Sequence, residues 1–264
     1  MRRTRIVSTI GPSSNSPEIL ESLLRAGVDV CRLNYSHGEP AEKTPIYERI
    51  RGFESIIGRP TCILADLPGP KLRLGVFPGV ILLVKGQTVE LHCGVAKMSN
   101  ASAAKLPVEY AGLSSELNVN DPVLIADGLI RLVVTQTKGK SAGIVTCVVD
   151  DGGPVSKRKG INVPGTLVDL PAIGPHDKLA LEHALQHGAD YIAVSYVRTA
   201  ADLLPAKKAI KKAGQHVPII AKIEHPAALE NLEEILDMAD GVMVARGDLG
   251  VEIPLEQVPL AQQN

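Results

Sequence analysis

Aromatic side chains are scarce in this sequence. They make up 3% of its 264 residues, and tryptophan is absent. Opposite charges nearly balance, with 28 Lys and Arg against 29 Asp and Glu. A chain without a basic field or a series of stacking rings lacks the usual features of a nucleic-acid-binding surface. Because 45% of the residues are hydrophobic, we expect a folded globular protein with no nucleic-acid partner.

Paired cysteines and long apolar runs are also missing. The four cysteines lie far apart without a CxxC pair, so we expect neither a disulfide framework nor a zinc site. Three of them lie in apolar runs typical of buried side chains. No apolar segment reaches the length of a membrane span, and none of the signal-peptide type follows the basic residues 1–5. These absences favour a cytoplasmic protein that does not enter a membrane.

Short apolar strands alternate with helical patterns at both ends of the chain. Ser16 and Pro17 are typical of a helix start and Gly27 of a helix stop. Such alternation predicts a parallel sheet covered by helices. The expected strands are residues 5–10, 28–33, 61–67, 191–195, 218–223 and 241–244, and the expected helices are residues 17–26, 45–57, 175–187, 201–213 and 226–238.

Helical periodicity disappears between about residues 70 and 164. Short runs of Val, Ile and Leu alternate there with glycines and polar turns, which predicts a small all-β insertion. The expected strands of this insertion are residues 80–84, 88–93, 123–125, 130–135 and 144–149.

Polar residues follow three of the buried strands of the expected parallel sheet. They are Arg32, Asn34 and Ser36 in the first place, Lys222 and Glu224 in the second, and Arg246 and Asp248 in the third. Taken alone, the first group also fits a frayed strand end, the second an internal ion pair and the third a surface turn. All three lie at carboxyl ends of parallel strands, where α/β enzymes build their sites, and ionic side chains on a covered strand are costly unless they bind something.

The motifs around these residues resemble those of the pyruvate kinases, in order and spacing, over essentially the whole chain. The most specific are RLNYSHG from Arg32 and VARGDLG from Val244; DLPGPKLRLG, KRKGINVPG and AKIEHP support them. The resemblance implies an α/β fold, a partial TIM (β/α)8-type barrel with about six of eight strands and an inserted small β-barrel domain. The implied parts are residues 1–69, the inserted lid 70–164, and the barrel continuation 165–264.

The resemblance also implies phosphoryl transfer from phosphoenolpyruvate to ADP, a step of glycolysis giving pyruvate and ATP. By it, Lys222 is the catalytic lysine and Arg32 grips the substrate phosphate. Glu224 and Asp248 bind Mg²⁺ or Mn²⁺, and the N–H groups of Gly247 and Asp248 hold the substrate carboxylate. The nucleotide-side residues are Asn34, Ser36, His37, Arg73 and Lys159.

The DLPGPK segment departs from the common family pattern. Leu67 and Lys71 stand where many members have threonine and glutamate. This combination is similar to the potassium-independent subgroup. We expect that Lys71, with Asp66, Asn34 and Ser36, supplies the positive charge of a bound K⁺, so that K⁺ is not required. The alternative is that Lys71 points into solvent. His225 also departs from the usual asparagine, and the sequence gives it no role.

The chain supplies about six of the eight strands that the resemblance implies and no carboxy-terminal domain. We therefore expect a truncated chain with little activity alone, from a parent that is a homotetramer. Two alternatives stay open. One is a metal-dependent aldolase or lyase acting on pyruvate-like acids, which ADP binding would exclude. The other is a non-catalytic fragment that keeps ligand-binding groups.

Overall fold

The structure is a computed structural model that describes residues 3–137 and 143–263. The chain divides into two compact units. The first unit consists of Met1–Pro70 and Pro171–Ala245, and the second of Lys71–Leu170 and Arg246–Asn264. Each unit has its own sheet and its own hydrophobic core.

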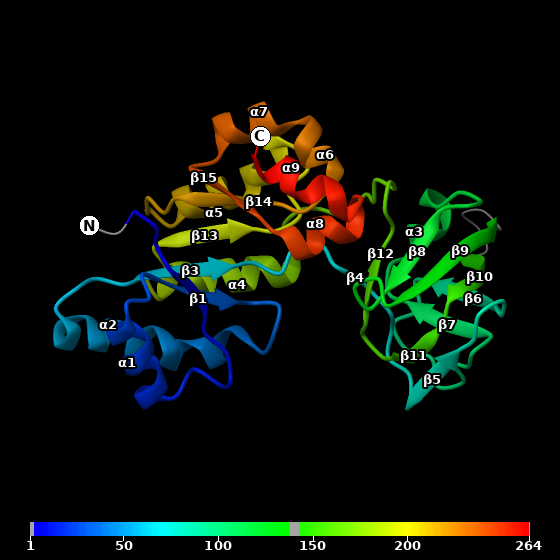
Figure 1. Cartoon of the computed structure of the whole chain (residues 1–264), viewed down its shortest axis with the longest axis horizontal. Coiled ribbons are helices and arrows are strands. Elements are labelled where there is room, and N and C mark those ends of the chain that lie inside the picture. The colour runs from blue at the N-terminus through cyan, green and yellow to red at the C-terminus, as the bar shows by residue number, and fades with distance from the viewer. Residues whose placement is uncertain (1–2, 138–142, 264) are drawn as a thin grey trace. The chain divides into compact units, whose positions relative to one another are not determined.

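The first unit is built on a six-stranded sheet in which every neighbouring pair is parallel (Figure 1). The strand order β1-β2-β3-β13-β14-β15 follows the chain, as in a barrel wall. The strand count and the fold class expected from the sequence are thereby confirmed. The strands are β1 (Val7–Thr9), β2 (Val30–Asn34), β3 (Cys62–Asp66), β13 (Tyr191–Val194), β14 (Ile219–Ile223) and β15 (Gly241–Val244).

Helices of the first unit connect these strands. The helix α1 has the ends expected from the sequence: Ser16 Oγ accepts from Ile19 N at 3.4 Å, and Gly27 ends the helix with φ of 107°. The helices are α1 (Pro17–Ala26), η1 (Pro40–Lys43), α2 (Thr44–Ile57), α4 (Pro175–Gln186), η2 (Ala200–Leu203), α5 (Leu204–Lys212), α6 (Pro226–Glu230) and α7 (Leu232–Met238).

The prediction of a single helix over residues 226–238 is wrong, because the structure has two helices there. Asn231 divides it into α6 and α7, with φ of −105° and ψ of 22°. The Asn231 side chain donates to Ala227 O at 2.9 Å and to Arg198 O at 3.0 Å. Because Arg198 lies 33 residues earlier in the sequence, local periodicity could not reveal this break.

The second unit contains a seven-stranded sheet of order β4-β12-β8-β9-β10-β6-β7 and the two-stranded sheet β5-β11. A bridge between Leu74 and Val108 joins the two edges of the larger sheet into a nearly closed barrel. The strands are β4 (Leu72–Arg73), β5 (Val80–Leu83), β6 (Thr88–Cys93), β7 (Lys105–Val108), β8 (Pro122–Ile125), β9 (Ile130–Thr137), β10 (Ile144–Asp151), β11 (Gly153–Ser156) and β12 (Gly160–Asn162).

Four strands of the second unit, β4, β7, β11 and β12, were not expected from the sequence. Each has only two to four residues, too few for an alternating pattern to show. The unit also contains the helices α3 (Leu113–Glu116), α8 (Arg246–Glu252), η3 (Leu255–Gln257) and α9 (Val258–Gln263). Asn162 Nδ2 donates to Glu252 Oε1 at 2.9 Å and so links β12 to α8.

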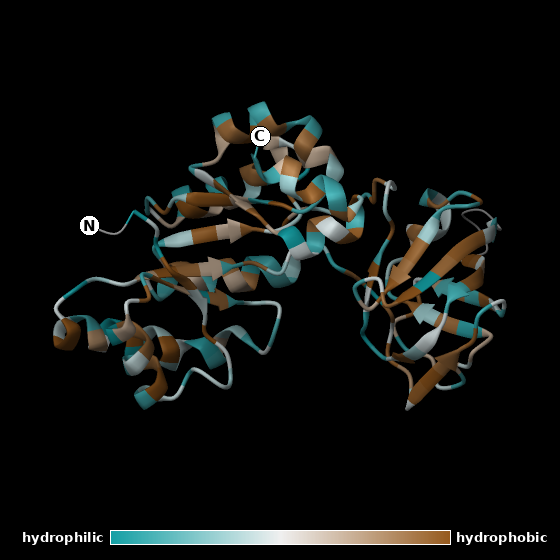
Figure 2. Ribbon diagram, viewed as in Figure 1, coloured by the Kyte–Doolittle hydropathy of each residue, from teal (hydrophilic) through white to brown (hydrophobic). Residues whose placement is uncertain are grey.

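Apolar side chains fill both cores. In Figure 2 the strands of the parallel sheet are mostly brown, which marks hydrophobic residues, whereas the strands of the second unit alternate between brown and teal. Cys31, Cys93 and Cys147 are buried and free, which confirms that they behave as small apolar residues. Among the helices of residues 3–137 and 143–263, none combines the length and the apolar character that crossing a membrane requires.

Arg51 connects α2 to the segments that lead into β3 and β13. Its guanidinium donates to Thr61 O at 2.9 Å, Gly188 O at 2.7 Å and Asp190 Oδ2 at 2.7 Å. The same Asp190 oxygen accepts from Ile63 N at 2.6 Å. One side chain therefore satisfies two loop carbonyls and fixes a carboxylate that caps the start of β3.

We expect Arg51→Met to lower the free energy of unfolding by about 2–4 kcal/mol, because it removes the cation paired with the Asp190 carboxylate and the donor to two carbonyls. The matched control is Arg25→Met on α1, where the arginine pairs with Glu21 on the surface. That change should cost less than about 0.5 kcal/mol. Chemical unfolding followed by circular dichroism measures both, and equal losses would contradict the role given to Arg51.

Candidate functional site

The carboxyl ends of four strands bring an ionic cluster together in the first unit. Arg32 comes from β2 and Asp66 from the end of β3. Ser195 follows β13, and Lys222 and Glu224 lie at the end of β14. Since the strands are parallel, their carboxyl ends meet at one rim of the sheet, which is where (β/α) barrels hold reactive groups.

Asp66 is the centre of this cluster. Its side chain is only 2% exposed, and it pairs with two cations. Arg32 Nη2 lies 2.6 Å and Nε 2.8 Å from Asp66 Oδ2, while Lys222 Nζ lies 3.1 Å from Oδ1. Arg32 also donates to Thr9 Oγ1 at 3.1 Å, yet 29% of its side chain stays exposed. The guanidinium is therefore fixed in direction and still accessible to an anion.

Lys222 is held by three oxygen atoms. Besides Asp66, its ammonium lies 2.8 Å from Glu224 Oε1 and donates to Ser195 Oγ at 2.8 Å. Ser195 in turn donates to Leu67 O at 2.7 Å. Burial alone lowers the pKa of Lys222, but the charges and hydrogen bonds of Glu224 and Asp66 raise it by more, so the net shift is upward. The structure thus keeps a charged ammonium at a fixed point.

Glu224 is 1% exposed and accepts a hydrogen bond from Tyr196 N at Oε2, 2.8 Å away. Tyr196 has φ of 52°, a left-handed conformation that non-glycine residues rarely adopt. The turn after β13 is therefore strained in order to aim a backbone N–H at this carboxylate. Ser195 and Tyr196 were missed at the level of sequence, because a serine or tyrosine after a strand gives no distinctive signal.

Asn34 is the last residue of β2, and Ser36 and His37 lie in the turn that follows it. Asn34 Oδ1 accepts from Ser36 N at 2.8 Å, so the first two contact each other. The carbonyl of His37 accepts from Lys43 Nζ at 2.7 Å. Asn34, His37 and Lys43 line an open hollow with Thr9 and Gly11. The imidazole of His37 is exposed to solvent.

Five further residues singled out from the sequence belong to the second unit, and their approach to the cluster stays a prediction. Lys71 Nζ is 3.8 Å from Asp127 Oδ1, and Arg73 Nη1 donates to Arg158 O at 3.1 Å. Lys159 is exposed just before β12. The remaining two, Gly247 and Asp248, lie in the first turn of α8, which begins at Arg246.

The structure gives His225 a local role that the sequence did not reveal. His225 is the N-cap of α6, and its Nδ1 accepts from Ala227 N at 3.1 Å. Burial, reinforced by Arg198, lowers the pKa of His225, which keeps the ring uncharged and able to accept. Histidine replaces a side-chain oxygen here as the cap of a helix directly behind Glu224.

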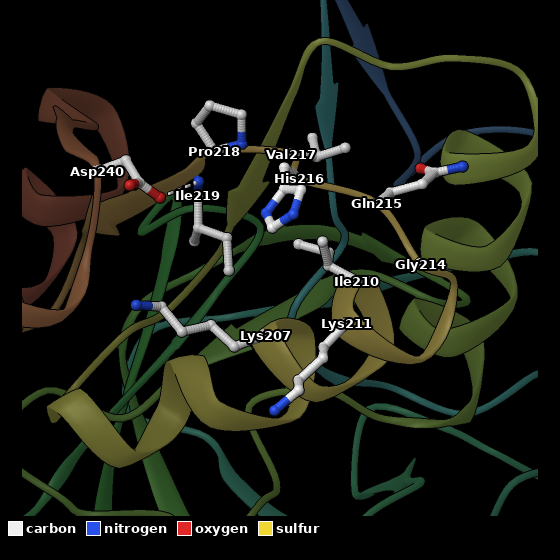
Figure 3. A pocket seen from close by; sticks show the side chains of 10 residues that line it. All are labelled: Lys207, Ile210, Lys211, Gly214, Gln215, His216, Val217, Pro218, Ile219 and Asp240. Atoms are coloured by element: carbon white, nitrogen blue, oxygen red, sulfur yellow. Dashed lines mark hydrogen bonds between the residues drawn. The ribbon is translucent and has the colours of Figure 1, made fainter.

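A second hollow lies at the start of β14, whereas the ionic cluster lies at the carboxyl end of that strand. Figure 3 shows the side chains that line this hollow. Lys207 and Lys211 of α5 line it together with His216, and Ile210 and Ile219 contribute apolar surface. Asp240 also lines it and accepts from Ile219 N at 2.8 Å, which fixes the start of β14. Because Lys222 and Glu224 lie at the other end of the strand, this hollow is not part of the candidate site.

Gly69 approaches the Lys222 partner Ser195 closely. Its φ is 72°, and a Cβ built on it would lie 2.6 Å from Ser195 Cβ. Gly58 has nearly the same φ, 73°, but no atom lies within 4 Å of such a Cβ. Comparing substitutions at the two glycines therefore distinguishes the cost of backbone strain from the cost of crowding against Ser195.

We expect Gly58→Ala to cost about 1 kcal/mol of stability, because only the left-handed backbone penalises alanine. Gly69→Ala should cost roughly 2–4 kcal/mol, because the methyl group must also displace Ser195. Thermal unfolding of the two variants measures the difference. If Gly69→Ala were no worse than Gly58→Ala, the close packing of Gly69 on Ser195 would be refuted.

The profile of the family described as "Pyruvate kinase, barrel domain" matches residues 1–264, the whole chain. A pyruvate kinase from Mycobacterium intracellulare is 44% identical over 263 residues, which cover 99% of this chain and 54% of that protein. Pyruvate kinases from Mycobacterium tuberculosis strain H37Rv and Agrobacterium vitis are 42% and 41% identical, again over 99% of the chain and 54% of each relative.

The chain thus spans about half the length of the curated relatives it matches. The match extends through both units, from the first strand of the parallel sheet to the helices of residues 246–263. The cluster of Arg32, Asp66, Lys222 and Glu224 lies within this matched region. By sequence and by fold, the chain belongs to the pyruvate kinase barrel-domain family.

Proposed function

We propose that this chain carries the catalytic cluster of a pyruvate kinase, which transfers a phosphoryl group from phosphoenolpyruvate to ADP. The observation that carries the proposal is the Lys222 ammonium, held at 2.8–3.1 Å from Glu224, Asp66 and Ser195 at the carboxyl ends of the parallel strands. Phosphoryl transfer depends mainly on positioning and on neutralising charge, and fixed cations serve both purposes. Relatives at 41–44% identity bear the name pyruvate kinase.

Arg32 and Lys222 divide the charge neutralisation between them. Arg32 is the more accessible of the two, and its fork of N–H groups suits the substrate phosphate. Lys222 is nearly buried, so its charge acts across a short distance in a poorly solvated environment on the phosphoryl group and the developing enolate. Asp66 holds both cations and thereby fixes the distance between them.

Glu224 fits a divalent metal by the chemistry of its donor atoms. Mg²⁺ prefers one or two carboxylates plus water and substrate oxygens, rather than a complete protein cage. In the part of the chain that the structure describes, no group of three or more His, Cys, Asp or Glu side chains could enclose a metal. We assign Glu224 and Asp248 to Mg²⁺ or Mn²⁺. When bound, the ion would neutralise charge on the substrate oxygens.

The nucleotide belongs, in this proposal, beside Asn34 and the turn that carries Ser36 and His37, with Arg73 and Lys159 contributing from the second unit. The inserted β-barrel of residues 70–164 would serve as a lid that excludes water during transfer. The helix dipole and the N–H groups at the start of α8 suit the substrate carboxylate beside Gly247 and Asp248.

We further propose that K⁺ is not required, because Lys71 replaces its charge beside Asp66. Leu67 and Lys71 support this assignment at the level of sequence. The contact that Lys71 makes within its own unit is weak. Asp127 is 3.8 Å away and its side chain is 73% exposed, so little free energy holds the ammonium there.

Lys222→Met should lower kcat by at least about 10²–10³-fold, because it removes the fixed charge that acts in the transition state. Binding of Mn²⁺, followed by electron paramagnetic resonance, should persist because Glu224 is unchanged. The control is Lys208→Met, an exposed lysine of α5. A coupled assay of the complete gene product with phosphoenolpyruvate, ADP and Mg²⁺ measures the effect. Turnover close to that of the unmodified protein would remove Lys222 from this role.

Replacing K⁺ by tetramethylammonium should leave kcat and both KM values unchanged. Lys71→Glu should make the same reaction depend on added K⁺, because a carboxylate at this position attracts the ion that the ammonium replaces. Lys97→Glu, at an exposed position of the second unit, controls for the change in net charge. Strong activation of the unmodified protein by K⁺ would refute the assignment of Lys71 while leaving that of Lys222 untouched.

A further inference from the structure

A cluster of two histidines, two tyrosines and a threonine lies on the outer side of β2, where the proposed reaction has no use for it. His183 lies on α4 and His187 is the C-cap of that helix, one turn later, and their rings stack with centroids 4.0 Å apart. Thr44 and Tyr47 come from α2, and Tyr35 follows β2. Both tyrosines are 1% exposed. We call these five residues the histidine chain.

Five hydrogen bonds link the members of the histidine chain. His187 Nδ1 lies 2.8 Å from His183 O, and His187 Nε2 lies 3.1 Å from Thr44 Oγ1. His183 Nε2 lies 2.9 Å from the same hydroxyl, and His183 Nδ1 lies 2.9 Å from Tyr35 Oη. Tyr35 Oη and Tyr47 Oη are 3.1 Å apart.

With both rings uncharged, one assignment of hydrogens satisfies all five contacts. A carbonyl only accepts, so His187 Nδ1 donates and its Nε2 must accept from the Thr44 hydroxyl. That hydroxyl has no second hydrogen, so it accepts from His183 Nε2. His183 Nδ1 then accepts from Tyr35, whose oxygen accepts from Tyr47. The carbonyl of His183 therefore fixes the direction of every bond.

The surroundings favour the uncharged rings. Burial, the adjacent His187 and Lys43 lower the pKa of His183 to about 4. The Lys43 ammonium lies 5.0 Å from the centre of the Tyr35 ring. Burial raises the pKa of Tyr47 to about 12, while Arg51 and Asp190 act on it more weakly and with opposite signs. Near neutral pH, burial, His187 and Lys43 of η1 thus all oppose a positive charge on His183.

Tyr35 connects this cluster to the candidate site because it lies between Asn34 and Ser36. Its backbone N–H donates to Asp66 O at 2.9 Å, and its side chain points to the core side of the strand. Lys43, which lies over the Tyr35 ring, donates to His37 O. An apolar ring in place of Tyr35 would fill the same volume, but only the hydroxyl connects the turn to α4 and α2 by directed bonds.

We propose that the histidine chain positions the nucleotide-binding turn, with His183 and Thr44 acting on Asn34, Ser36 and His37 through the Tyr35 hydroxyl. The identity of the ligand, ADP, rests on the proposed function. The assignment of hydrogens within the histidine chain is independent of that function. His183, Thr44 and Tyr35 are positioning residues, because none of them touches the substrates in this proposal.

The first test concerns the hydrogens alone. Long-range ¹H–¹⁵N correlation spectra of the 264-residue chain at pH 8 should show His183 as the Nε2–H tautomer and His187 as the Nδ1–H tautomer. A charged His183, or the Nδ1–H tautomer at that position, would overturn the directed chain. This result does not depend on whether the protein transfers phosphoryl groups.

The second test compares Thr44→Val with Thr44→Ser in the complete gene product. Valine matches the shape of threonine but removes the hydroxyl between the two rings, whereas serine keeps the hydroxyl. We expect Thr44→Val to raise KM for ADP about three- to tenfold, the effect of one weakened hydrogen-bonded contact, with KM for phosphoenolpyruvate unchanged. Thr44→Ser should restore the original value.

Tyr35→Phe removes only the hydroxyl that joins the turn to His183, and it should raise KM for ADP in the same way if Thr44→Val does not fold. A loss of thermal stability with the KM for ADP unchanged would show a purely structural role and overturn the proposal. If the unmodified gene product used no ADP while the tautomers agreed, the proposed function would fail but the directed chain would stand.

Discussion

The pairing of Lys222 with Glu224 and Asp66 is the interaction on which the rest of the first unit depends. A single ammonium buried at the end of a covered strand would be strongly destabilising, as would either carboxylate alone. Together they are tolerable because each charge has an opposite neighbour at 2.8–3.1 Å and the remaining donor and acceptor positions reach Ser195, Tyr196 N and Arg32. The cluster therefore forms only if four strands end at the same height.

The parallel register supplies that common height. Asn34 of β2 is opposite Asp66 of β3, and Asp66 is opposite Ala193 of β13. On the next pair, Ala221 is opposite Val194. A slip of one residue in any of these pairs would turn an ionic side chain toward the apolar helices and an apolar one toward the site. Other registers are thus disfavoured because they would bury a charge without its partner. The observed register brings the ionic side chains of the site together.

Much of the fold and of the candidate site could be predicted from the sequence. Ionic residues two apart on strands that are otherwise apolar indicated Arg32, Lys222 and Glu224, since period-2 alternation places them on one face. The caps of α1 were readable because Ser16, Pro17 and Gly27 act through local backbone geometry. Ser195 and Asn231 were not readable. Each makes its decisive hydrogen bond with a residue about 30 positions away, Lys222 and Arg198 respectively, so only the folded chain shows it.

Strand β2 shows how one alternation can serve two purposes. Arg32 and Asn34 point toward the ionic rim, while Leu33 and Tyr35 point into the core between sheet and helices. The two faces are therefore connected covalently by single backbone steps. A displacement of Tyr35 can pass directly to Asn34 and Ser36, because single planar peptide units join these residues. Polar groups in the core are costly, and an apolar core would stabilise α4 and α2 at least as well. What the directed bonds of His183, Thr44 and Tyr35 add is a single geometry, and the turn beside the site benefits from it because rigid positioning lowers the entropy lost when a ligand binds.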